Sequence, residues 1–157
     1  TLKSTLMDAS TIYCYLRDNE FLKTNVCVMG RSLGSAPAIE LCVRFSTITC
    51  CVIESGYADP IPLVERRGLR INNITVEENA LFNNSTKIRS VKCPILIMHG
   101  EVDSLISPEE AKLNYNNACS QKKSLEILKG VGHNDMMMAE NNAYFTILSN
   151  FFTQVLR

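Results

Sequence analysis

The residue types best suited to chemistry in this chain are a serine, an aspartate and a histidine, each of which follows an apolar run. Ser32 is the centre of a G-x-S-x-G motif at residues 30–34, Asp103 follows the run 93–100, and His133 lies in a loop after a fourth run. A serine hydroxyl becomes an effective nucleophile when a base removes its proton, and that base needs a carboxylate to orient it. The set predicts acyl transfer through a covalent acyl-serine.

The G-x-S-x-G motif joins an apolar run at 25–29 to a helix-period stretch at 36–45. This pattern predicts a strand, a sharp turn and a helix, with the serine in strained backbone at the turn. The two glycines are expected to let the strand and helix approach without Cβ clashes. The backbone N–H of Leu33 would lie at a helix start, where unpaired donors favour negative charge. Leu33 is therefore the predicted oxyanion donor.

The base and the acid each have competing candidates. Of the two histidines, His99 ends a strand and is expected to satisfy local backbone groups, whereas the glycine-bounded loop of His133 can reach the serine. Asp103 is favoured as the acid by its spacing after a strand. Glu54 and Asp59, which follow the second strand, stay open as alternatives because some hydrolases place the carboxylate there.

The elements that must position these residues alternate along the chain. Apolar runs without polar alternation, separated by helices, indicate a parallel sheet that is covered on both faces. The fold class predicted is therefore α/β, a three-layer sandwich with a mostly parallel sheet. The expected strands are 25–29, 49–54, 93–100 and 125–128, and the expected long helices are 2–18, 36–45, one capped by Ser107 and opened by Pro108, and 137–155. The last helix is expected to pack through Phe145, Leu148, Phe151, Phe152 and Val155.

The segment 55–89 interrupts this alternation. It contains Pro60, Pro62 and an Asn-rich stretch, and its clearest helix signal is Thr75 as an N-cap. An irregular segment of this length in a compact domain commonly serves as a lid or binding surface. We therefore expect a lid-like insertion at 55–89.

Composition narrows the classes of protein to which the chain can belong. With 157 residues, 46% of them hydrophobic and 20% charged, the chain suits one globular domain. Its net charge of zero gives no electrostatic sign of nucleic-acid binding, and no run suggests a transmembrane segment. The number of cysteines is odd, at seven, and several of them lie in apolar runs, which favours reduced thiols in the cytoplasm. Neither a metal nor a cofactor is expected.

Three motifs carry a resemblance to a known family. The stretches 30–38, 99–103 and 132–135 together resemble the α/β-hydrolase superfamily. The likeness is greatest to intracellular serine hydrolases of the α/β-hydrolase-domain-containing group, which include protein depalmitoylases, and to the serine aminopeptidase-like branch.

This resemblance implies a role for each matched residue. Ser32 would be the nucleophile, Asp103 the acid, His133 the base, and Leu33 N–H an oxyanion donor. It implies cleavage of an ester, thioester or amide in a small-molecule, lipid-acyl or peptide substrate. The rival interpretation is a non-catalytic binding or scaffold module, or an inactive fragment, that retains the fold.

The resemblance covers only strands five to eight of the family fold. Strands one to four and the second oxyanion donor have no counterpart here. We therefore expect residues 1–157 to form a single partial domain, the C-terminal half of a larger hydrolase. The N-terminal half or a second copy of the chain is expected to pair with the exposed edge of the strand before Ser32. A cytoplasmic location is expected, and membrane association through other segments stays open.

Overall fold

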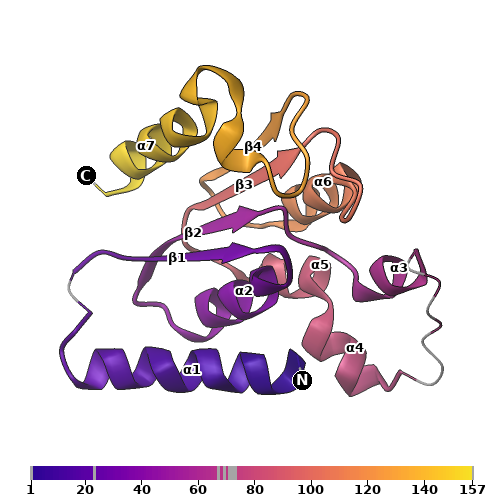
Figure 1. Ribbon diagram of the computed structural model, residues 1–157. Helices are drawn as coiled ribbons and strands as arrows, with labels where there is room; N and C mark the ends of the chain where they lie inside the picture. The colour runs from indigo at the N-terminus through magenta and orange to yellow at the C-terminus, as the bar shows by residue number, and fades with distance from the viewer. Residues whose placement is uncertain (1, 23, 67, 69, 71–73, 157) are drawn as a thin grey trace.

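Four apolar runs form the strands of one parallel sheet, in the spatial order β1-β2-β3-β4 (Figure 1). The computed structural model describes residues 2–22, 24–66, 68, 70 and 74–156. All four predicted strands are present, with ends that differ from the predicted ones by at most two residues. Their bounds are Val26–Arg31 for β1, Ile48–Glu54 for β2, Ile95–Gly100 for β3 and Lys123–Leu128 for β4.

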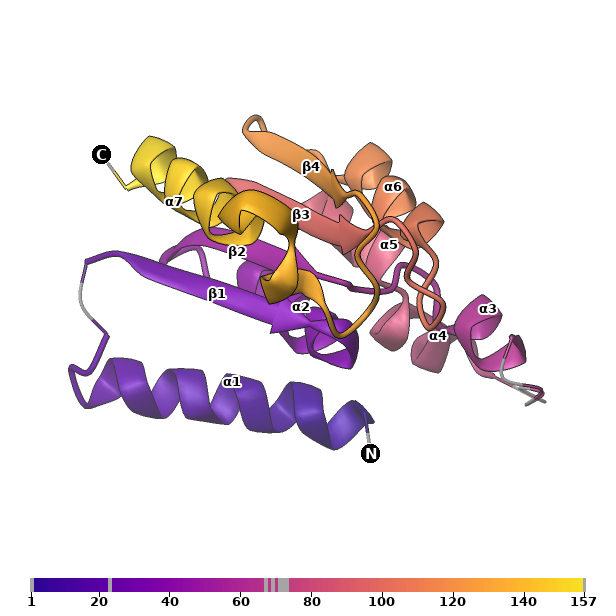
Figure 2. The ribbon, with the colours of Figure 1, turned by 45° about the horizontal axis from the view of Figure 1, so that its top comes forward.

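Helices cover both faces of the sheet, as the sequence predicts. The helices α1, α2 and α6 lie on one side and α7 on the other (Figures 1 and 2). Two separate apolar cores fill these spaces, one containing Ile39 of α2 and the other Phe151 of α7. The bounds of the four helices are Leu2–Asp18 for α1, Ser35–Arg44 for α2, Pro108–Asn117 for α6 and Ala143–Val155 for α7.

The described part of the insertion 55–89 contains four short helical segments. Of these, α3 and α4 lie beyond the carboxyl ends of β1 and β2 (Figure 1), whereas α5 packs against α2 and α6. The predicted cap is confirmed, because Thr75 and Glu78 form a reciprocal capping box at the start of α4. Asp59 caps α3 by accepting from the N–H of Ile61. The bounds are Pro60–Glu65 for α3, Val76–Phe82 for α4, Asn84–Lys87 for α5 and Ile88–Ser90 for a 3₁₀ turn.

The last helix differs from its prediction. It begins at Ala143 rather than near residue 137, because Asn141 and Asn142 each adopt φ of 55°, outside the right-handed helical region. Two 3₁₀ turns, Met136–Met138 and Glu140–Asn142, occupy the preceding residues. Phe145 was expected on the packed face but is largely exposed, and its neighbour Tyr144 is buried instead.

The cysteines also differ from the expectation, which favoured reduced thiols over disulfides. Cys27 of β1 and Cys50 of β2 are register partners in adjacent strands, with Cα atoms 4.8 Å apart, and their sulfur atoms form a disulfide. That Cα separation is within the usual range for a disulfide. Five other cysteines are free thiols: Cys14, Cys42, Cys51, Cys93 and Cys119.

The strand β1 lies at an edge of the sheet and pairs with β2 alone among the described strands. Its side chains Val26 and Val28 pack against the α2 side, whereas Met29 and Arg31 on the other face are exposed. The far edge of the strand that precedes Ser32 thus has no partner strand in the described part of the chain.

The turn after β1 depends on one close approach of backbones. A Cβ atom added at Gly30 would lie 2.5 Å from the Cβ of Ala38 and would overlap the carbonyl of Gly34. At Gly34 an added Cβ would meet nothing within 4 Å, and its φ of −65° suits any residue. The prediction that close packing requires glycine is therefore confirmed at Gly30 and wrong at Gly34.

These two glycines give a matched pair of variants. Gly30→Ala is expected to lower the free energy of unfolding by about 1–3 kcal/mol, because α2 must move away from β1. Gly34→Ala is expected to change it by less than about 0.5 kcal/mol. Urea denaturation followed by circular dichroism measures both values, and equal losses in the two variants would contradict the packing argument.

Candidate active site

Ser32 lies at the turn between β1 and the helices that follow it. It is the first residue of a 3₁₀ turn, Ser32–Gly34, and its φ of 53° is in the left-handed region that non-glycine residues rarely occupy. The buried hydroxyl of Ser35 donates a hydrogen bond of 2.7 Å to the carbonyl of Ser32. The strained backbone expected for this position is thus present, and a neighbouring side chain holds it.

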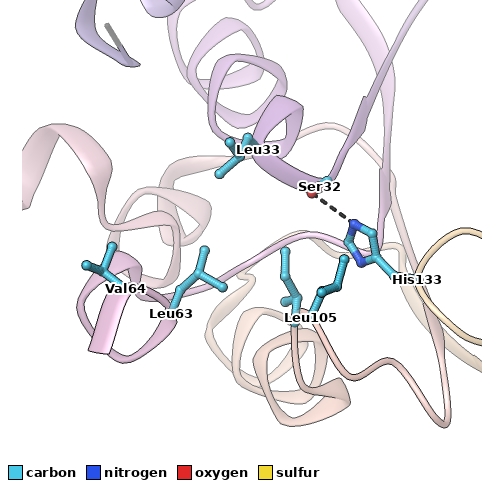
Figure 3. A pocket seen from close by; sticks show the side chains of 7 residues that line it. Ser32, Leu33, Leu63, Val64, Leu105 and His133 are labelled. Carbon is cyan, nitrogen blue, oxygen red and sulfur yellow. Dashed lines mark hydrogen bonds between the residues drawn. The ribbon is translucent and has the colours of Figure 1, made fainter. Parts of the chain in front are cut away.

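His133 lies between the other two candidate residues. Its Nδ1 is 2.7 Å from Oδ2 of Asp103. Its Nε2 is 3.0 Å from Oγ of Ser32, the contact that is dashed in Figure 3. A carboxylate only accepts hydrogen bonds, so Nδ1 of the neutral ring carries the proton and Nε2 accepts from the serine hydroxyl. The three side chains thus form one continuous hydrogen-bonded chain that ends on the serine oxygen.

The carboxylate of Asp103 is fully buried and hydrogen-bonded on both oxygens. Its Oδ1 accepts from the backbone N–H groups of Leu105 and Ile106, each at 2.9 Å, and its Oδ2 accepts from His133. The two competing carboxylates have other partners. Glu54 accepts from Arg31 and Tyr144, and Asp59 caps α3.

His99 lies behind this carboxylate. Its Nε2 is 2.8 Å from the carbonyl of Ile106, as expected for a histidine that satisfies local backbone, and also 3.2 Å from Oδ2 of Asp103. Burial lowers the pKa of His99, and the carbonyl and the Asp103 charge oppose this shift only in part. A neutral His99 can donate from Nε2 toward both acceptors.

The loop that carries His133 is held against the end of β3. The carbonyl of Val131 accepts from the N–H of Val102 at 3.0 Å, and the N–H of Gly130 donates to Oε2 of Glu101 at 2.9 Å. A Cβ at Gly100 would overlap the carbonyl of Val131, so glycine is required at this crossing.

An apolar cavity of about 290 Å³ opens beside Ser32 and His133. Leu33 lies on one side of it, and Leu63 and Leu105 lie on the other (Figure 3). The wall that includes Leu63 and Val64 belongs to α3, within the insertion. The N–H of Leu33 lies in the first turn of the 3₁₀ helix, where a backbone donor has no acceptor within the helix.

Other kinds of site were sought over the described residues. No three His, Cys, Asp or Glu side chains in that part of the chain converge as metal ligands would. None of the helices described is at once long enough and apolar enough to cross a membrane.

Several curated proteins of similar sequence have alpha/beta hydrolase in their names. The chain is 27% identical over 154 residues to protein bem46 of Schizosaccharomyces pombe, an alignment that covers 94% of this chain and 50% of bem46. It is 25% identical over 160 residues to human alpha/beta hydrolase domain-containing protein 17B, covering 99% and 51%. The chain thus spans about half the length of these relatives. No family model matches it.

Solved structures of similar fold include esterases. A Pyrococcus furiosus esterase superposes with a TM-score of 0.78 at 18% identity, covering 97% of this chain and 62% of that one. The esterase domain of a Rhodothermus marinus protein gives a TM-score of 0.73 at 19% identity, covering 97% and 69%. The chain has a partial α/β-hydrolase fold. Ser32 occupies a sharp strand-to-helix turn, and Asp103 and His133 follow it in that order along the chain.

Two residues of this α/β-hydrolase fold that contact the site were not recognised from the sequence. Arg31 bonds to the carbonyl of His133, and His99 approaches Asp103. The sequence held a weak signal for each, because Arg31 adjoins Ser32 and His99 ends the strand that leads to Asp103. The partners of Arg31, however, come from β2 and from the loop after β4, and strand order brings them together.

The buried, neutral His99 predicts a pH dependence of stability. Since its folded pKa lies below the ordinary value of 6.5, the unfolded chain binds the proton more readily, and stability is lost as the pH falls below about 6.5. We expect the free energy of unfolding of His99→Gln to depend less steeply on pH, with a slope smaller by up to about 1.4 kcal/mol per pH unit. Urea titrations of both proteins from pH 7.5 to 5 test this, and parallel curves would contradict it.

Proposed function

We propose that this chain carries the catalytic residues of a serine hydrolase that cleaves an ester, thioester or amide. The observation that carries the proposal is the continuous hydrogen-bonded chain from Asp103 through His133 to Oγ of Ser32. The relatives named alpha/beta hydrolase and the esterases of similar fold support the same class of reaction.

In the proposed reaction, Oγ of Ser32 attacks the carbonyl carbon while Nε2 of His133 takes the hydroxyl proton. Asp103 holds the ring and stabilises the imidazolium. The N–H of Leu33 donates to the oxyanion. His133 then gives the proton to the leaving alcohol, thiol or amine, which departs as the carbonyl re-forms on the acyl-serine. A water molecule, deprotonated by His133, releases the acid and restores Ser32.

The cavity beside Ser32 supports a substrate with an apolar group next to the carbonyl. Its lining, apart from Ser32 and His133, consists of Leu, Val and Ile side chains, and such surfaces favour apolar ligand groups. We propose that the insertion 55–89 serves as the lid-like wall of this cavity, since Leu63 and Val64 belong to it.

We also propose that the free edge of β1 pairs with another strand, supplied by the N-terminal half of a longer hydrolase or by a second copy of the chain. The absence of a further described strand at this edge and the exposure of Met29 support this. An unpaired sheet edge is a ready template for strand addition.

Labelling of the intact chain with a fluorophosphonate probe tests the reaction. We expect one covalent adduct per chain, none in Ser32→Ala, and labelling slowed by about 10³-fold or more in His133→Ala, because the hydroxyl then keeps its proton. Ser104→Ala, which alters an exposed serine on the Asp103 loop, is the control and should label normally. A folded chain that stays unlabelled would contradict the proposal and favour the binding-module alternative.

Because β1 has a free edge, we expect the purified chain to associate with itself in the absence of other proteins. Sedimentation velocity at micromolar concentration should show dimers or larger species, and Met29→Lys should shift the population toward monomer by placing a charge beside the edge. Met7→Lys, at an exposed site on α1, is the matched control and should leave the distribution unchanged. A stable, folded monomer of the unaltered chain at every concentration would contradict this proposal.

A further inference from the structure

The guanidinium of Arg31 joins the strand of Ser32 to the loop of His133. Its Nη2 donates two hydrogen bonds of 2.7 Å, one to the carbonyl oxygen of His133 and one to Oδ1 of Asn134. Its Nε donates to Oε1 of Glu54 at 3.0 Å. One side chain thus contacts the carboxyl end of β2 and two consecutive residues of a loop about a hundred positions away in sequence.

The carboxylate of Glu54, which accepts from Nε of Arg31, is itself held in place. Its side chain is 2% exposed, and its Oε2 accepts from the hydroxyl of Tyr144 at 2.8 Å. Burial, together with the hydrogen bond to Glu54, raises the pKa of Tyr144 to about 12, so the phenol stays protonated and donates. A buried carboxylate that lost its cation would be strongly destabilised, so Glu54 constrains where Arg31 lies.

We propose that Arg31 is a positioning residue that sets the distance between the imidazole of His133 and the hydroxyl of Ser32. This inference rests on the proposed hydrolase function. Both ends of the 3.0 Å contact between Nε2 and Oγ are tied to Arg31, because Ser32 follows it in the chain and His133 accepts from it through its own carbonyl. The planar guanidinium presents its donors in a fixed fork, so it restrains the loop in orientation as well as in distance.

Two features separate this role from an ordinary ion pair. A pair that served only Glu54 would need only the Nε contact, whereas Nη2 uses both of its hydrogens on the His133 loop. In addition, Arg31 is half-exposed, so its guanidinium reaches from the buried carboxylate to the surface where this loop runs.

The test compares Arg31→Met with Lys87→Met. Lys87 forms an ion pair of 2.8 Å with Glu40 that joins α5 to α2, and both partners are mostly buried. Removing either cation leaves a little-exposed carboxylate without its counter-charge, but of the two cations only Arg31 contacts the His133 loop. Turnover of an aryl ester gives kcat and KM, and chemical denaturation confirms that each variant is folded.

We expect kcat of Arg31→Met to fall by about 30- to 100-fold with KM within about threefold, since a base misplaced by about 1 Å costs that much in rate. Arg31→Lys should lie between this variant and the unaltered chain, because it keeps the charge beside Glu54 but loses the fork. Lys87→Met should keep kcat within about twofold. A kcat for Arg31→Met that matches that of Lys87→Met would overturn the inference.

A second measurement decides the matter without turnover. Amide hydrogen exchange at residues 130–135 should be about tenfold faster in Arg31→Met than in the unaltered chain, and unchanged in Lys87→Met. If the unaltered chain neither labels nor turns over, the proposed function fails, and exchange then decides whether Arg31 holds the loop. Equal exchange in all three proteins would overturn the positioning role independently of activity.

Discussion

The arrangement of the candidate active site depends on the buried carboxylate of Asp103. A charge removed from water is stable only when its oxygens are bonded, and here two backbone N–H groups and the ring of His133 supply those bonds. The same carboxylate therefore holds both the turn at 103–106 and the ring of His133. His99 lies behind the same oxygen, so the end of β3 takes part in the same interaction.

The parallel sheet explains why residues far apart in sequence can meet there. Parallel strands end at one edge, so the segments that follow β1, β3 and β4 emerge side by side. The strand β2 lies between β1 and β3 and contributes Glu54 rather than a member of the hydrogen-bonded chain. Glu54 is thus close enough to anchor Arg31, which in turn contacts the loop after β4.

The edge position of β1 places the nucleophile candidate in an unusual setting. The α2 side of the strand packs into a core, while its other face is exposed and its outer edge has no described partner. Within the described chain, Ser32 is held instead by three features that lie close to it in space. These are the close approach at Gly30, the hydrogen bond from Ser35, and the contacts of Arg31 with β2 and the His133 loop.

The amino-acid sequence by itself determined the local features of this protein. The strand, turn and helix around Ser32, the four strands, and the caps at Thr75 and Ser107 depend on nearby residues, so motif and periodicity were sufficient to predict them. The residues of the hydrogen-bonded chain were also predicted, because each follows a strand. Only the tertiary structure decided their distances.

Tertiary structure also decided the features that depend on strand register and on which face a residue occupies. Register placed Cys27 opposite Cys50. Packing buried the side chain of Tyr144, whereas Phe145 was the residue expected to be buried. The left-handed backbone conformation of Asn141 and Asn142 makes α7 begin later in the chain than predicted. The partners of Arg31 come from β2 and from the loop after β4. No pattern along the chain reports such contacts, because they arise between segments that are neighbours only in the folded sheet.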